Sequence, residues 1–185
     1  MRVASAALAG RAMRPLPLTG ADVTNNDILR AVRYMLDLSD PAVVEIIRLV
    51  RADFPIDKAE VQALTRKEGE PGFLECGDST LAHFLDGLIL HLRGRDESRS
   101  PRPPEKQLNN NAVLKKLRVA FALKDVDMHA LFDSVGIELG KAELNALFRE
   151  RSHKNYRACG DQLLRNFLRA LTLRVRPEAV TPPQS

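Results

Sequence analysis

The chain of 185 residues contains one stretch twice, and this duplication constrains its fold more than any other feature. Residues 25–93 align with residues 110–176, at an offset of 83 positions over most of their length and of 85 near their starts. The clearest matched blocks are Lys58-Ala59-Glu60 with Lys141-Ala142-Glu143, Cys76-Gly77-Asp78 with Cys159-Gly160-Asp161, and Phe84-Leu85 with Phe167-Leu168. Such a repeat indicates a duplicated supersecondary module. We therefore expect two copies of one fold.

Each copy predicts four helices and no strand. In the first copy, apolar side chains recur at helical spacing behind three possible N-cap signals, Asn25-Asn26, Asp40-Pro41 and Asp57. Asp78 and Asp161 precede the fourth helix of each copy and are interpreted as its N-cap. The longest apolar stripes lie on these fourth helices: Leu81, Phe84, Leu85, Leu88 and Leu92, and then Leu164, Phe167, Leu168, Leu171 and Val175. The sequence thus predicts an all-α protein.

The two copies are expected to pack together about a pseudo-twofold axis, because a module of about 70 residues is marginally stable alone. The fourth helices are the natural contact, since they are the longest and most apolar. Residues 94–109 are rich in proline and predict an extended linker. Residues 1–24 and 177–185 lie outside the repeat and are expected to be disordered.

Composition narrows the class of protein. A hydrophobic content of 44% is ordinary for a globular chain. No apolar run approaches the roughly 20 residues that span a bilayer, so no membrane contact is expected. Two cysteines are too few for the disulfide framework of small secreted domains, and residues 1–24 fit neither a secretory signal nor a transit peptide. We expect a cytoplasmic protein.

The two cysteines are the first candidates for chemistry. Each lies at a predicted helix N-terminus, where the helix dipole can lower a thiol pKa, but an aspartate two residues later opposes the thiolate. We interpret four residues kept in both copies as structural, with a redox or nucleophilic role as the alternative: Cys76, Asp78, Cys159 and Asp161.

No catalytic or cofactor motif is present. The histidines and cysteines lack the paired spacing of a zinc site, and no glycine-rich phosphate loop or nucleophile elbow occurs. We expect no metal and no cofactor, and we nominate no catalytic residue. An enzyme with a composite site at the pseudo-twofold axis remains an alternative reading.

The net charge of +4 conceals an asymmetry between the copies. Residues 25–95 contain 9 Lys and Arg against 12 Asp and Glu, a net charge of −3, whereas residues 110–176 contain 13 against 7, a net charge of +6. Such an asymmetry indicates either a surface that faces nucleic acid or two halves that attract each other.

Basic residues of the second copy are the candidate contacts to nucleic acid. Three arginines, Arg165, Arg169 and Arg176, share one side of the last helix and form a basic stripe. Tyr156 stands among further cations and can stack on a base. The full candidate set is Lys115, Arg118, Arg149, Arg151, Lys154, Tyr156, Arg157, Arg165, Arg169 and Arg176.

Two functions follow from this charge pattern. The first is a non-enzymatic binding protein whose second copy contacts RNA, DNA or another anionic partner. The second is a protein–protein adaptor or homodimeric scaffold, in which the acidic copy of one chain meets the basic copy of another. Salt-dependent dimerisation would favour the second, and loss of bound material after nuclease treatment would favour the first.

Several motifs also resemble a known family. They are Asn26-Asp27-Ile28-Leu29-Arg30, Arg33-Tyr34-Met35-Leu36, the segment 82–88 (AHFLDGL) and the segment 153–168 (HKNYRACGDQLLRNFL). Together they resemble the YehS-like family of bacterial proteins, over residues 25–176. The resemblance implies a small bacterial cytoplasmic protein with duplicated helical domains. It implies no activity, cofactor or catalytic residue.

Overall fold

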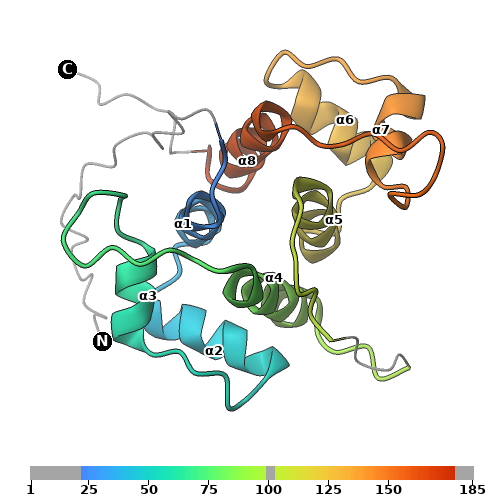
Figure 1. Cartoon of the computed structure of the whole chain (residues 1–185). Helices are drawn as coiled ribbons and strands as arrows, with labels where there is room; N and C mark the ends of the chain where they lie inside the picture. Colours follow the sequence, from blue (N-terminus) through green and yellow to red (C-terminus); the bar gives the residue numbers. More distant parts are fainter. Residues whose placement is uncertain (1–21, 99–102, 178–185) are drawn as a thin grey trace, which may run out of the picture.

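The computed structural model describes residues 22–98 and 103–177, and these residues form eight helices and no strand (Figure 1). The first repeat holds α1 (Asn25–Met35), α2 (Asp40–Val50), α3 (Lys58–Leu64) and α4 (Asp78–Arg93). The second repeat holds α5 (Asn110–Ala120), α6 (Asp125–Asp133), α7 (Lys141–Leu147) and α8 (Asp161–Val175). The all-α prediction with four helices in each copy is confirmed. Of the residues 1–24 and 177–185 that were expected to be disordered, 1–21 and 178–185 lie outside the described residues, whereas Thr24 caps α1.

The two repeats pack together with pseudo-twofold symmetry, as expected. α4 packs against α5, and α1 packs against α8; these two contacts are equivalent because α1 corresponds to α5 and α4 to α8. Figure 1 shows these four helices at the centre, with α2 and α3 on one side and α6 and α7 on the other.

The expected main contact between the two fourth helices is wrong. Each fourth helix takes the first helix of the other repeat as its main partner there. Its apolar stripe is therefore buried among helices of both repeats, and one continuous hydrophobic core runs through the molecule. The stripe is fully buried from Leu81 to Leu88, whereas Leu92 at its end is 39% exposed.

A glycine in α4 sets how closely α2 approaches it. A Cβ atom placed on Gly87 would lie 1.9 Å from the backbone oxygen of Ile46 in α2. The equivalent position in α8 is Ala170, which is buried. The two repeats therefore share a fold but differ in how the second helix fits against the fourth.

The first two helices are capped one residue earlier than expected. The hydroxyl of Thr24 caps α1 and accepts from the backbone N–H of Asp27, whose carboxylate accepts from the Thr24 N–H at 3.0 Å. Ser39 caps α2, so Asp40 is its first residue. Asp57 caps α3 as predicted, accepting from the Glu60 N–H at 2.8 Å. A threonine and a serine thus take the capping role.

Charged side chains connect the two repeats. The ammonium group of Lys116 on α5 pairs with the carboxylate of Asp86 on α4 and with Glu105 of the linker, the latter at 2.7 Å. At the other contact, Arg176 donates to the backbone oxygen of Tyr34 on α1 at 3.0 Å. Its guanidinium also lies over the Tyr34 ring, 5.0 Å from the ring centroid.

Candidate ligand-binding site on the second repeat

Two consecutive asparagines at the start of α5 organise the site. The side-chain oxygen of Asn111 accepts from the backbone N–H of Cys159 at 2.9 Å, and its amide donates to the oxygens of Leu147 and Arg157 at 2.8 Å each. The Tyr156 hydroxyl donates to the same Asn111 oxygen at 2.8 Å. This buried carboxamide therefore has a partner for every hydrogen-bonding position.

The first repeat contains the same arrangement. Asn26 accepts from the backbone N–H of Cys76 at 2.9 Å and donates to the oxygens of Leu64 and Leu74 at 2.8 Å. The position of Tyr156 is occupied there by Phe73, which has no hydroxyl. The sequence predicted only Asn25-Asn26, as a possible N-cap of α1, and did not predict this motif; the recurrence of the asparagine pair in the two copies was the available signal.

The interpretation of Asp78 and Asp161 as N-caps is wrong. The N-caps of α4 and α8 are Gly77 and Gly160, which places each aspartate inside the first helical turn. Asp78 instead accepts from the side chain of Asn25 at 2.8 Å and from the Leu108 N–H at 3.1 Å. Asp161 accepts from Asn110 at 2.7 Å. Each aspartate thus ties the fourth helix to the first helix of its own repeat.

Cys76 and Cys159 stand two residues before Asp78 and Asp161, and both cysteines are buried. Burial, followed by the negative charge of Asp78, raises the pKa of the Cys76 thiol to about 12. Burial and Asp161 likewise raise the pKa of the Cys159 thiol to about 12. Both are protonated at neutral pH, the form that is a poor nucleophile. Within residues 22–98 and 103–177, no three His, Cys, Asp or Glu side chains gather where they could hold a metal ion.

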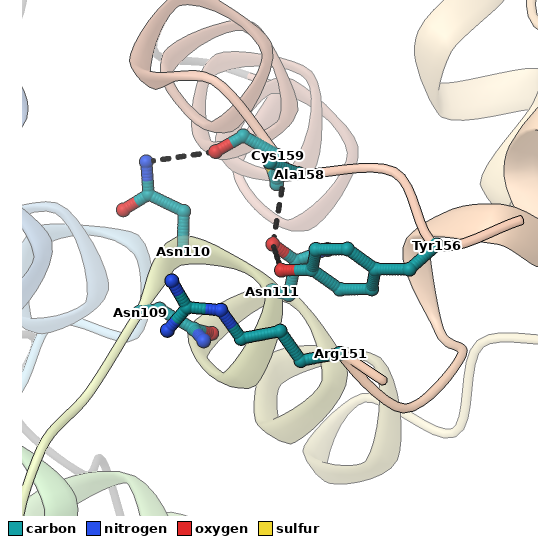
Figure 2. A pocket seen from close by; sticks show the side chains of 7 residues that line it. All are labelled: Asn109, Asn110, Asn111, Arg151, Tyr156, Ala158 and Cys159. Atoms are coloured by element: carbon teal, nitrogen blue, oxygen red, sulfur yellow. Dashed lines mark hydrogen bonds between the residues drawn. The ribbon is translucent and has the colours of Figure 1, made fainter. Parts of the chain in front are cut away.

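A shallow, open pocket of about 350 Å³ lies over the start of α5. Figure 2 shows Arg151 extending across it, with its guanidinium toward Asn109 and Asn110, and Tyr156 beside it with its hydroxyl toward Asn111. No acidic side chain lines the pocket, and α5 is the one helix of the described chain without an acidic residue in its first turn. The lining residues are Asn109, Asn110, Asn111, Arg151, Tyr156, Ala158 and Cys159.

The loop that closes this pocket differs in charge from its counterpart. Residues 148–158 carry Arg149, Arg151, Lys154 and Arg157 with one acid, Glu150. The equivalent residues 65–75 carry two cations and three acids. The replacements that change charge include Glu68 by Arg151, Pro71 by Lys154, Leu74 by Arg157 and Glu75 by Ala158. The asymmetry between the repeats is therefore concentrated at this loop, which we name the basic loop (residues 148–158).

Four of the candidate cations are exposed and have no interaction partner among the described residues. The side chains of Lys115, Arg151, Lys154 and Arg169 make no hydrogen bond or ion pair with any residue that the structure describes. Lys115 occupies the position of Arg30, which donates to the oxygen of Arg66 in the equivalent loop. From this correspondence we expect Lys115 to lie near the basic loop, which carries Arg151 and Lys154.

The remaining cations already have partners. Arg118 pairs with Asp125 at 2.6 Å and lies 4.5 Å above the Phe148 ring centroid; Arg33 forms the same pair with Asp40, so this contact belongs to the shared fold. The Arg157 guanidinium pairs with Glu143 at 2.8 Å. Arg149 lies 3.2 Å from the His153 ring nitrogen.

The predicted basic stripe on α8 does not form an open surface. Arg165 is half-buried, its Nε atom is buried, and it donates to Gln162 at 3.0 Å. Arg176 lies against α1, as described above. Only Arg169 of the three is exposed. The positions of Arg165 and Arg169 correspond to Ala82 and Asp86, and Asp86 contacts the neighbouring repeat, so this side of the fourth helix faces the other repeat.

No helix among the described residues is both long and apolar enough to cross a bilayer.

A family model described as a protein of unknown function, DUF1456, matches residues 25–94 and again residues 110–176. The uncharacterized protein YehS of Escherichia coli (strain K12) is 44% identical over 150 residues, which are 81% of this chain and 95% of that protein. No solved structure matches. Both family matches coincide with the four-helix repeats, and the chain therefore belongs to the DUF1456 family, whose domain it contains twice.

Proposed function

We propose that this protein is a non-enzymatic, cytoplasmic binding protein that contacts nucleic acid, RNA or DNA, through its second repeat. The observation that carries the proposal is the basic loop, where exposed cations without protein partners surround a tyrosine. Phosphate groups bind such cations, and an aromatic ring beside them can stack on a base. The equivalent loop of the first repeat keeps the fold but carries more acids than cations.

The proposal favours some of the candidate contact residues over others. Lys115, Arg151 and Lys154 are its preferred contacts, because their charges are not used within the described protein. Arg149 and Arg157 can contribute after exchanging their present partners. Arg118 and Arg176 are left out, since they hold the fold together.

Charge reversal on the basic loop tests the proposal. Arg151→Glu with Lys154→Glu should weaken binding to a labelled oligonucleotide at least tenfold at low salt and lower the slope of log K against log salt by about two. The matched control is Lys58→Glu with Lys67→Glu, which changes the net charge equally at exposed positions of the first repeat. Equal losses of affinity in both variants would mean that only the net charge of the protein matters, and not the basic loop. Absence of binding by the unaltered protein would contradict the proposal.

A second candidate function is assembly through opposite charges. The acidic loop of the first repeat, with Glu68, Glu70 and Glu75, and the basic loop lie beside α3 and α7, on opposite sides of the molecule in Figure 1. A contact between the acidic loop of one chain and the basic loop of another is therefore head-to-tail and can continue along a chain of molecules. Sedimentation should then show concentration-dependent association that disappears as salt rises; a monomer at every salt concentration would exclude it.

A further inference from the structure

We propose that the pocket between the start of α5 and the basic loop receives one unstacked nucleotide of a single-stranded nucleic acid. This inference rests on the proposed function and names its ligand class. Arg151 would hold the phosphate, Tyr156 would support the base, and Asn109 and Asn110 would face the edge of the base. The pocket is therefore the part of the surface that distinguishes single strands from duplexes.

The hydrogen-bonding groups left over in the pocket suit a base. Asn109 uses its side-chain oxygen to cap α5, and its amide has no partner among the described residues. Asn110 uses both amide hydrogens, on Cys159 and Asp161, and its oxygen has no partner there. The pocket lining therefore includes one amide group that can donate and one side-chain oxygen that can accept, both without partners among the described residues. A phosphate can use only the donor, whereas the edges of nucleobases present both kinds of group.

The Tyr156 ring is held in place by the protein. Its hydroxyl donates to Asn111, which is itself fixed by three further hydrogen bonds. A ring that is already ordered loses little conformational freedom when a base stacks on it. The fold does not require the hydroxyl, because Phe73 occupies the equivalent position. Replacing Tyr156 with phenylalanine is therefore a fold-neutral change.

The openness of the pocket favours a polymer over a free nucleotide. Sites for free small molecules enclose most of the ligand surface, whereas this pocket is largely open to solvent. A nucleotide within a strand is held additionally by the phosphates on either side of it. Lys154, exposed in the basic loop, and Lys115, exposed one helical turn after Asn111, are the cations that would meet those neighbouring phosphates. Bases paired in a duplex are stacked and cannot enter.

The test compares one labelled 12-nucleotide single strand with the duplex of the same sequence by fluorescence anisotropy. Ala158→Glu adds to the pocket the residue that the first repeat carries as Glu75, so the fold should accept it. It should weaken single-strand binding at least tenfold and change duplex binding less than threefold. The matched control Asn155→Glu adds the same charge to the same loop at a residue that does not line the pocket. It should change both affinities equally and by less than threefold.

Two further measurements complete the test. Tyr156→Phe should bind the single strand within twofold of the unaltered protein, whereas Tyr156→Ala should lose about tenfold. A free mononucleotide should displace the strand only at a concentration at least a hundredfold higher than that of an unlabelled strand. Equal effects of Ala158→Glu on strand and duplex, or efficient displacement by the mononucleotide, would overturn this inference and leave the proposed function standing. Absence of binding to either form would remove both.

Discussion

The side chain of Asn111 accepts a hydrogen bond from the backbone N–H of Cys159 at 2.9 Å, across 48 residues of sequence. It thereby fixes the segment that enters α8 against the first turn of α5. Asn26 makes the same contact with Cys76 in the first repeat. The candidate site thus contains a structural element that both repeats share. The excess of cations over acids in the basic loop is the part that is found in the second repeat alone.

Asn111→Ala should destabilise the protein by about 2–4 kcal/mol, because it leaves the buried oxygen of Leu147 and the N–H of Cys159 without partners. Urea denaturation followed by circular dichroism measures the change. Asn155→Ala, at an exposed position of the same loop, is the control and should have little effect. A loss as small as that of the control would show that water replaces the carboxamide.

Gly87→Ala should also destabilise the protein, by about 2 kcal/mol or more. Alanine normally stabilises a helix interior by about 1 kcal/mol relative to glycine, so the expected sign is the opposite of the helix propensity. The reason is the 1.9 Å approach of the added Cβ to the Ile46 oxygen, which would force α2 away from α4. The reciprocal change Ala170→Gly should cost about 1 kcal/mol by propensity alone. A more stable Gly87→Ala variant would contradict the observed packing.

Removal of one partner from the ion pair between the repeats should loosen their contact. Lys116 is 12% exposed and Asp86 22%, so Lys116→Ala leaves a half-buried carboxylate and should cost about 1–3 kcal/mol. A double-mutant cycle with Asp86→Ala isolates the interaction between the two side chains. The exposed pair Arg51–Asp53 is the control and should show no measurable coupling. Zero coupling between Lys116 and Asp86 would mean that this ion pair contributes nothing to the contact between the repeats.

Stability should fall at alkaline pH because of the two buried thiols. Their pKa values are raised to about 12 in the folded protein, so the folded state keeps protons that the unfolded chain releases from about pH 9 upward. Between pH 9 and 12 each thiol should therefore lower the free energy of unfolding by up to about 1.4 kcal/mol per pH unit. The double variant Cys76→Ala with Cys159→Ala should show a flatter decline in denaturation measured at pH 7, 9 and 10.5. An identical slope would assign the pH dependence to other groups.

The sequence by itself determined the elements that depend on local periodicity. The stripe from Leu81 to Leu88 required a helix with one buried side, and its recurrence from Leu164 to Leu171 required a second copy of the same module. The cap of α3 at Asp57 could also be read directly, because a cap involves residues only three positions apart.

Tertiary structure decided which side chains meet. The pair Asn25-Asn26 at the start of α1 was interpreted as a cap, yet Asn26 and its counterpart Asn111 bond to residues 36 to 50 positions away, and sequence spacing does not encode such contacts. The same contrast between sequence and tertiary structure holds for the cations. Their number in the second copy was visible in the sequence, but only packing separated the exposed Arg151 from Arg176, which lies against Tyr34. An arginine is available to a ligand only when no carboxylate, carbonyl or ring of its own fold already holds it, and the fold alone brings those partners near.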